Sequence, residues 1–351
     1  MINEIVLEDM QALYKRNIEW EKLNGKSFLI TGAYGMIASY VVFMLIFLNE
    51  YHNASIQIYA LCRNKEKAMA RFGNYFNKNY FHYVESDLLN GIPQDISVDY
   101  IIHAASFASS QFFGTDPVGT VQPNVFGTYG LLEYAKNKQV TSFLYVSSGE
   151  VYGSTDVEKV KEDHFGSSNP LDIRYCYGES KRMGECFCKC FSHQYQVPVK
   201  IVRLGHTYGP TMNLSTDKRV FAEFVSNVVA GNNIEIKSDG SPMRAFCYIV
   251  DAVAGFFTVL FKGINGEAYN IANFDGLISI RDLAKTLVEL FPERVLEAKF
   301  VERDKNDNYI ESSQKKHNVP DTGKLEALGW KCEYSVRDGF YRTIMSFLNR
   351  E

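Results

Sequence analysis

Residues 31–38, with the sequence TGAYGMIA, constrain the fold of this chain more than any other part. They follow the short apolar segment 27–30 and open into the apolar run 41–48. The glycine at position 32 permits a tight bend, and the glycine at position 35 lets the backbone approach a pyrophosphate at a helix N-terminus. We therefore predict a strand, a turn and a helix that bind a dinucleotide. The predicted cofactor contacts in this turn are Gly32, Tyr34, Gly35, Met36 and Ile37.

Strand-like and helical segments alternate as far as residue 204. Apolar runs at 56–61, 100–105, 142–146 and 199–204 are separated by helical stretches. This alternation is typical of a parallel sheet with crossover helices, so we predict an α/β fold with a Rossmann-type doubly wound parallel sheet. Ahead of the sheet, the apolar positions within residues 1–24 predict an amphipathic N-terminal helix.

Bulk properties argue against several functional classes. The longest apolar run, 41–48, is far shorter than the roughly 20 residues that a membrane span needs. A net charge of -4 without a Lys/Arg run gives no sign of nucleic-acid binding. Seven cysteines without a CxxC pair predict reduced thiols and no metal site. Because the start also lacks a secretory signal pattern, we expect a cytoplasmic protein without a membrane or nucleic-acid partner.

The end of the second predicted strand bears on cofactor choice. An Asp or Glu is expected there to bind the ribose 2′-hydroxyl of NAD, but the chain has Arg63. An arginine suits a 2′-phosphate, so this position favours NADP over NAD. The alternative is that Arg63 stacks on adenine or is solvated. Asp87 and Leu88, after a third short strand, are predicted contacts on the adenine side.

The spacing of Tyr177 and Lys181 places both side chains on one face of a helix. A phenol with a pKa of about 10 is a poor base, but an adjacent ammonium and a positive nicotinamide stabilise its phenolate. Tyr177 would then take a hydroxyl proton as hydride leaves the carbon. Ser148, on the loop after a strand, is predicted to hydrogen-bond the same oxygen. The alternative is two ordinary helix-surface residues, which the upstream glycine turn disfavours.

Together these motifs resemble the extended short-chain dehydrogenase/reductase family that acts on nucleotide-diphosphate sugars. The resemblance runs from about residue 26 into the C-terminal region. Within the family, NPLDIRYCYGESKR at 169–182 is most like the UDP-glucuronate decarboxylase branch. The other matching segments are HAAS at 103–106, NVFGT at 124–128, VSSGEVYG at 146–153, RLGHTYGP at 203–210 and RAFCYIVD at 244–251.

The resemblance implies a Rossmann domain made of residues 25–204 with 245–272. It implies a smaller C-terminal α/β substrate lobe made of residues 205–244 with 273–351. A homodimer and a nucleotide-diphosphate sugar as substrate are also implied. His206 stands where the family usually has Asn, and Thr211 where the decarboxylases have Arg. The further contacts implied are Ala104, Ala105 and Lys181 for the cofactor, and Ser106, Asn124 and His206 for the substrate.

Position 149 separates activities within the resembled family. Ser148-Gly149-Glu150 aligns with Thr-Asp-Glu in the sugar 4,6-dehydratases and Thr-Ser-Glu in the decarboxylases. Losing water from C5/C6 needs a base and an acid; Glu150 could be the base, but Gly149 supplies no acid. Losing carbon dioxide needs no leaving-group acid, so this pair favours decarboxylation. A structural carboxylate is the alternative role for Glu150.

Arg219 and Arg244 are candidate ligands of substrate anions, because a guanidinium offers a planar fork to phosphate or carboxylate. Surface salt bridging is the competing interpretation. The leading hypothesis is therefore a UDP-glucuronate decarboxylase-like enzyme that oxidises the sugar at C4. A 4-epimerase or an NADPH-dependent 4-keto-sugar reductase is the alternative, favoured by Gly149, His206 and Arg63. A 4,6-dehydratase is weaker, and a non-catalytic NAD(P) sensor weaker still.

Overall fold

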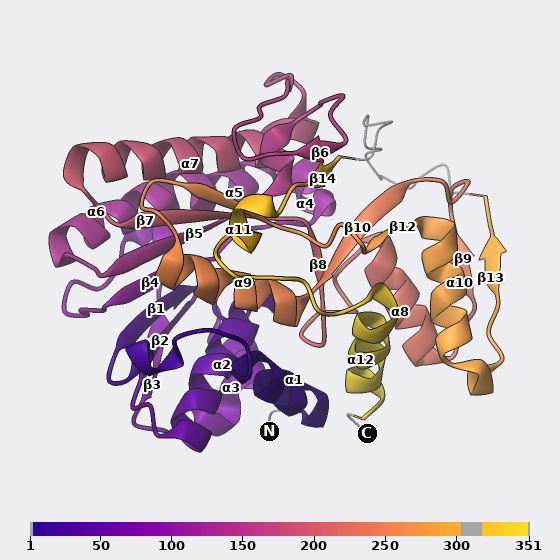
Figure 1. Cartoon of the computed structure of the whole chain (residues 1–351), viewed down its shortest axis with the longest axis horizontal. Helices are drawn as coiled ribbons and strands as arrows, with labels where there is room; N and C mark the ends of the chain where they lie inside the picture. Colours follow the sequence, from indigo (N-terminus) through magenta and orange to yellow (C-terminus); the bar gives the residue numbers. More distant parts are fainter. Residues whose placement is uncertain (1–2, 303–317, 350–351) are drawn as a thin grey trace.

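A seven-stranded parallel sheet forms the larger part of the protein (Figure 1). The computed structural model describes residues 3–302 and 318–349. The strand order is β11-β7-β5-β4-β1-β2-β3. Strands β2 and β3 are therefore added on one side of β1 and the later strands on its other side, as in a doubly wound fold. The predicted Rossmann-type architecture is confirmed. The strands are β1 (Ser27–Thr31), β2 (Gln57–Cys62), β3 (Phe81–Glu85), β4 (Tyr100–His103), β5 (Ser142–Ser148), β7 (Val199–Leu204) and β11 (Ala268–Ile271).

Helices bury both faces of this sheet. Neighbouring residues of a strand point to opposite faces, so Phe28 and Ile30 of β1 join one hydrophobic cluster and Leu29 joins the other. Both faces are apolar, as expected for a parallel sheet covered on two sides. The first cluster includes residues of α2 (Met36–His52), α3 (Lys65–Phe72) and α9 (Ile249–Lys262), and the second those of α6 (Thr128–Lys138) and α7 (Cys176–Tyr195).

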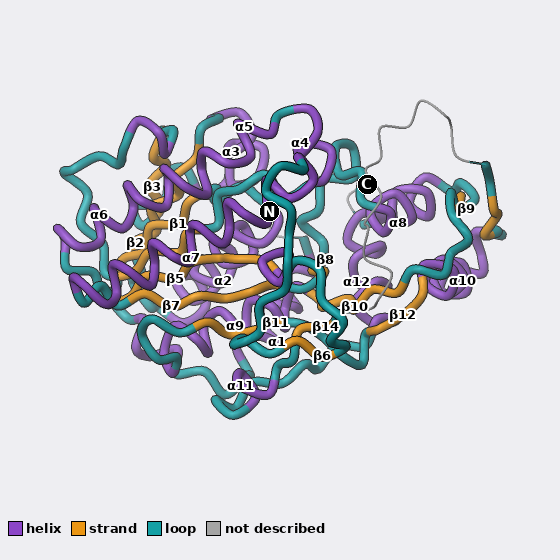
Figure 2. The backbone as a smooth tube through the Cα atoms, turned by 90° about the horizontal axis from the view of Figure 1, so that it is seen from above, coloured by secondary structure: helices purple, strands orange, loops and turns teal. Residues whose placement is uncertain are grey.

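A smaller lobe stands beside the sheet and is well separated in the view from above (Figure 2). Helices α8 (Val220–Ala230), α10 (Ile280–Leu290) and α12 (Val336–Leu348) pack together there. The strands of this lobe are β8 (His206–Tyr208), β10 (Met243–Tyr248) and β12 (Leu277–Ser279) in one sheet, and β9 (Ile234–Ile236) and β13 (Ala298–Phe300) in another.

The predicted domain limits stay a prediction, but two short segments lie across them. β10 pairs with β8 and β12 in the lobe, although residues 245–272 were assigned to the Rossmann domain. Helix α11 (Gly323–Glu326) packs on β11 and α9, although residues 273–351 were assigned to the lobe. Strand pairing and helix packing decide these placements, and neither is readable from local sequence.

The N-terminal helix is shorter than predicted. Helix α1 spans Glu4–Tyr14, followed by a turn and a separate 3-10 turn at Trp20–Leu23, so the expected single helix over residues 1–24 is wrong. The break lets Arg16 reach Asp251, with 2.7 Å between Nη2 and Oδ1.

Helix α1 also joins the two parts of the molecule. It packs on α2 and α9 of the larger part and on α12 of the lobe. Its Asp9 is fully buried and accepts hydrogen bonds from Tyr40 of α2, from Tyr248 of β10 and from Arg342 of α12. Across the described ranges, no helix combines the length and apolar character that a membrane crossing would require.

Candidate active site

The glycine turn between β1 and α2 leaves a backbone cradle. Gly32 has φ +63°, and a Cβ there would lie 2.8 Å from the Ala105 Cα, so this position requires glycine. Gly35 caps α2 without a side-chain hydrogen bond, which leaves the first backbone N–H groups of the helix free. A Cβ on Gly35 would lie 3.0 Å from the Gly32 carbonyl oxygen. The turn therefore fits the diphosphate of a dinucleotide, held by backbone donors at a helix N-terminus.

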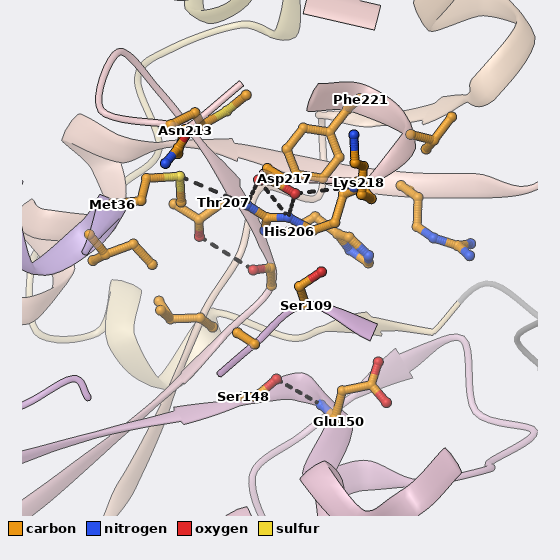
Figure 3. Close-up of a pocket in the computed structure, with 18 of the residues that line it drawn as sticks. Met36, Ser109, Ser148, Glu150, His206, Thr207, Asn213, Asp217, Lys218 and Phe221 are labelled. Atoms are coloured by element: carbon orange, nitrogen blue, oxygen red, sulfur yellow. Dashed lines mark hydrogen bonds and ion pairs between the residues drawn. The ribbon is translucent and has the colours of Figure 1, made fainter. Parts of the chain in front are cut away.

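This turn opens onto a large cleft between the sheet and the lobe, with a volume of ≈ 2790 Å³. A pocket for one small ligand usually has roughly 300–1,000 Å³, so the cleft has room for two. Figure 3 shows Ser148 and Glu150 on one side of it, facing His206 and Asp217 on the other. The predicted site residues that line it are Tyr34, Gly35, Met36, Ile37, Ala104, Ser106, Ser148, Glu150, Tyr177, Lys181, His206, Arg219 and Arg244.

Tyr177 and Lys181 lie one turn apart near the start of α7, and both are buried. Burial raises the pKa of Tyr177 to about 12, although a hydrogen bond with the Ser148 hydroxyl lowers it in part. Burial lowers the pKa of Lys181 to about 7. The Lys181 amine donates to the Val146 carbonyl oxygen (2.7 Å) and lies 5.9 Å from the Tyr177 ring centre. In the protein alone, the phenol is therefore protonated.

Glu150 stands in the 3-10 turn that follows β5. Its backbone N–H donates to the Ser148 hydroxyl oxygen (3.2 Å), and its carboxylate lies 3.5 Å from the Nη1 of Arg174. At the neighbouring Gly149, a Cβ would make ordinary contacts of 3.5 Å and longer, so the fold itself does not require glycine there. The backbone at position 149 could therefore carry a residue other than glycine.

Two arginines of the lobe face the cleft in different states. Arg219 forms a two-pronged ion pair with Asp217, with 2.9 Å between Nε and Oδ1. Arg244 donates to the Met243 carbonyl oxygen, and no acidic partner is found for it within residues 3–302 and 318–349. Loss of contact with water, together with the positive charges of Arg244 and Arg219, holds the pKa of His206 below its ordinary value. His206 therefore presents a neutral imidazole to the cleft.

The predicted adenine side lies just outside the cleft lining. Arg63 pairs with Asp87 at 3.6 Å between Nη1 and Oδ2, and its guanidinium lies 5.1 Å from the Phe107 ring centre. Leu88 is buried against Gly127, where a Cβ would approach its side chain to 3.1 Å. The roles of Arg63, Asp87 and Leu88 in cofactor binding stay predictions.

The structure does not place Asn124 at the substrate. Its side chain is fully buried and does not line the cleft; the amide donates to the Thr120 carbonyl oxygen (3.1 Å) and the Ser180 hydroxyl (3.0 Å). The structure therefore gives no support to a substrate contact of Asn124, which stays a prediction. Asn124 ties the helix before α6 to α7, and so steadies the helix that carries Tyr177.

Sequence reasoning missed three cleft residues. Ser109 contributes a buried hydroxyl without a hydrogen-bond partner among the described residues, and Figure 3 places it between the two sides of the cleft. Phe113 stacks on Tyr177, with 5.0 Å between ring centres and 12° between planes. Arg174 precedes Tyr177 by three residues, so its nearness to the site was a usable signal.

Among the described residues, no group of three or more His, Cys, Asp or Glu side chains is arranged to hold a metal ion. The seven cysteines are all free.

Comparisons with known proteins agree with this architecture. The NAD dependent epimerase/dehydratase family matches residues 28–272. UDP-glucuronic acid decarboxylase 6 of Arabidopsis thaliana is 32% identical over 312 residues, covering 89% of this chain and 85% of that protein. Human dTDP-D-glucose 4,6-dehydratase is 29% identical, covering 91% and 89%. The structure of a Bacillus cereus UDP-glucuronic acid 4-epimerase, in complex with UDP-glucuronic acid and NAD, has a TM-score of 0.75 at 23% identity, covering 91% and 99%.

Proposed function

The chain belongs to the NAD dependent epimerase/dehydratase family, and we propose that it is an NAD(P)-dependent enzyme of nucleotide-sugar metabolism, most like a UDP-glucuronate decarboxylase. It would oxidise C4 of a nucleotide-diphosphate sugar and then release the C6 carboxylate as carbon dioxide. The observation that carries this proposal is the meeting of Ser148, Glu150 and Tyr177 in one cleft with the glycine turn.

Each residue has a defined task in this reaction. A bound nicotinamide supplies a hydride acceptor for C4. Tyr177 moves the proton of the C4 hydroxyl, and Ser148 orients that hydroxyl through its own hydrogen bond to the phenol. The resulting C4 ketone makes a C6 carboxylate a β-keto acid, whose carbon–carbon bond electrons pass into the C4 enolate when carbon dioxide leaves. Glu150 adds the proton at C5. The hydride would then return from the nicotinamide to C4 and Tyr177 would return the proton to the C4 oxygen, so that a pentose nucleotide forms with no net oxidation.

Charge and the identity of residue 149 favour decarboxylation. Gly149 offers no acid for a departing hydroxyl, which dehydration at C5/C6 would need. Arg244, which has no acidic partner among the described residues, supplies a cation for a substrate anion. Arg219 would need to share its guanidinium with Asp217 to do the same. The A. thaliana decarboxylase also supports this choice.

A 4-epimerase or an NADPH-dependent 4-keto-sugar reductase is the second candidate. The neutral imidazole of His206 at a substrate position, together with Gly149, favours it. A 4,6-dehydratase is a weaker third because of the missing acid. Of these candidates, the reductase would need a supply of NADPH, because it consumes NADPH in proportion to its product.

Mass spectrometry of products from UDP-, GDP-, CDP- and dTDP-sugars tests these alternatives. We expect UDP-glucuronate, without added cofactor, to give carbon dioxide and a pentose nucleotide. Epimerised product without carbon dioxide, or NADPH consumption with a 4-keto-sugar nucleotide, would favour the second candidate instead.

The variant Tyr177→Phe tests the shared chemistry, because it removes the hydroxyl that moves the C4 proton. We expect turnover to fall by about 10²–10⁴-fold, the usual contribution of a positioned acid–base group. Tyr341→Phe, at an exposed tyrosine of α12, is the control. Full turnover by Tyr177→Phe would remove both catalytic candidates.

For assembly and location we propose a cytoplasmic homodimer that associates through the α6–α7 face. These helices pack together, and Phe126, Tyr129 and Met183 on or beside them are exposed apolar side chains. A second copy of the same face would cover them. Light scattering should give a dimer for the wild-type chain and a monomer for Phe126→Glu; a wild-type monomer would contradict this assembly.

A further inference from the structure

Arg174 holds an unusual position beside the reacting groups. It lies in the 3-10 turn Ile173–Tyr175, directly ahead of α7, and lines the cleft although its side chain is only 16% exposed. Its Nη1 is 3.5 Å from a carboxylate oxygen of Glu150. That separation exceeds the usual range of about 2.7–2.9 Å for a charge-assisted hydrogen bond. Arg174 therefore attracts the carboxylate without fixing it in a short hydrogen bond.

The guanidinium rests on an aromatic support. It lies 5.8 Å from the ring centre of Phe113, which is buried and itself stacks on Tyr177 at 5.0 Å. Phe113 belongs to the short helix α4 (Ser110–Thr115), which packs against the turn that holds Arg174. A continuous set of contacts therefore runs from the phenol ring through Phe113 and Arg174 to Glu150.

The hydrogen bonding of Arg174 also departs from that of a structural arginine. Its Nε is buried and has no hydrogen-bond partner among the described residues. Buried donors in native proteins are nearly always paired, so an unpaired one calls for an explanation. A guanidinium placed by the needs of a reaction, and not by its own pairing, provides that explanation.

We propose that Arg174 is a positioning residue that holds the Glu150 carboxyl group at C5 of the sugar while Tyr177 serves the C4 hydroxyl. This inference rests on the proposed C4 oxidation followed by loss of carbon dioxide. When the C5–C6 bond breaks, its electron pair enters the C4 enolate. The bond can re-form until a proton is added to C5, so net release of carbon dioxide depends on delivery of that proton. Glu150 delivers that proton and regains one from water. The cation of Arg174 stabilises the negative charge that Glu150 carries once it has given its proton to C5, and so keeps the group in place until water returns a proton.

The test separates the two chemical stages in single-turnover reactions with UDP-glucuronate, by following reduced nicotinamide and released carbon dioxide together. For Arg174→Gln we expect C4 oxidation to change by less than about threefold, while carbon dioxide release slows by on the order of 10²-fold. A 4-keto-sugar nucleotide should accumulate. Arg337→Gln, at an exposed arginine of α12, should alter neither stage.

A double-variant comparison checks that Arg174 acts through Glu150. Glu150→Gln should give the same split between stages, and Arg174→Gln combined with Glu150→Gln should be no slower than the slower single variant. Arg174→Lys keeps the charge without the planar fork, and should recover part of the carbon dioxide release. It also serves if Arg174→Gln does not fold.

Two outcomes would overturn the inference by itself. One is equal slowing of both stages in the folded Arg174 variants, as expected for general damage to the site. The other is an additive loss in the double variant. If the wild-type chain leaves C4 of every nucleotide sugar unoxidised, the proposed function fails and the inference fails with it.

Discussion

Lys181 shows how much a single side chain depends on its surroundings. Its spacing from Tyr177 was readable from the sequence, but its amine turns to the Val146 carbonyl oxygen, not to the phenol. Burial lowers the pKa of Lys181 to about 7 and raises that of Tyr177 to about 12, so the protein alone favours the neutral form of each group. We therefore expect the positive charge of a bound nicotinamide to be needed to activate the pair.

The shifted pKa of Lys181 predicts a pH dependence of stability. Between about pH 7 and about pH 10.5 the unfolded chain holds a proton on Lys181 that the folded chain has lost, so stability rises with pH across this window. Lys181→Met removes that dependence. Urea unfolding should show the wild-type chain gaining on Lys181→Met as the pH rises, whereas Lys285→Met, at an exposed lysine, should follow the wild type.

Arg63 supports a prediction about cofactor choice. If it binds a 2′-phosphate, Arg63→Ala should weaken NADP binding by at least about tenfold and leave NAD binding unchanged, since a hydrogen bond to a charged group contributes ~1.5–3 kcal/mol. Asp87→Asn frees Arg63 from its ion pair and should strengthen NADP binding. Calorimetry with both cofactors measures these changes. Equal NADP affinity before and after Arg63→Ala would refute the preference.

At the scale of the element, the β1–α2 turn was the most predictable part of the molecule. Local backbone geometry requires its glycines, so the sequence alone was sufficient to place them. The contacts of Asn124 and Arg174 depend instead on how α7 packs beside distant segments, and no local pattern encodes that packing. The end of α1 at Tyr14 was also missed, and the residue that follows soon after it, Arg16, pairs with a residue 235 positions away that local sequence does not reveal.

Gly32→Ala tests the cradle directly. The positive φ and the 2.8 Å approach to Ala105 should make this change destabilising by ~1–3 kcal/mol and should abolish dinucleotide binding. Gly130→Ala is the matched control, since nothing lies within 4 Å of a Cβ there and the residue is in α6. It should leave binding intact and raise the melting temperature slightly. Normal cofactor affinity in Gly32→Ala would contradict the assigned role of the turn.

At the scale of the whole molecule, Asp9 ties together elements that lie far apart in the chain. Its partners come from α2, β10 and α12, so one carboxylate links the sheet-bearing part to the lobe across the N-terminal helix. The division into a nucleotide-binding part and a lobe followed from the resemblance, but this linkage did not. It depends on side chains that meet only after all four elements have packed.

Removing the Asp9 carboxylate should therefore weaken the contact between the sheet-bearing part and the lobe. Asp9→Ala leaves Arg342 without its buried partner, a change that typically costs ~3–5 kcal/mol. We expect a clear drop in the free energy of unfolding, measured with urea. Glu8→Gln, which removes the exposed partner of the same arginine, should cost far less. Similar losses of unfolding free energy for the two variants would show that Asp9 is not central to the contact between the two parts.

The docking of α1 on α12 also brings the two ends of the described chain together, with the Asn3 amide donating to the Ser346 carbonyl oxygen at 2.7 Å (Figure 1). A reporter fused ahead of α1 and an acceptor fused behind α12 would therefore sit as neighbours. Energy transfer between such a pair would report directly on separation of the two helices.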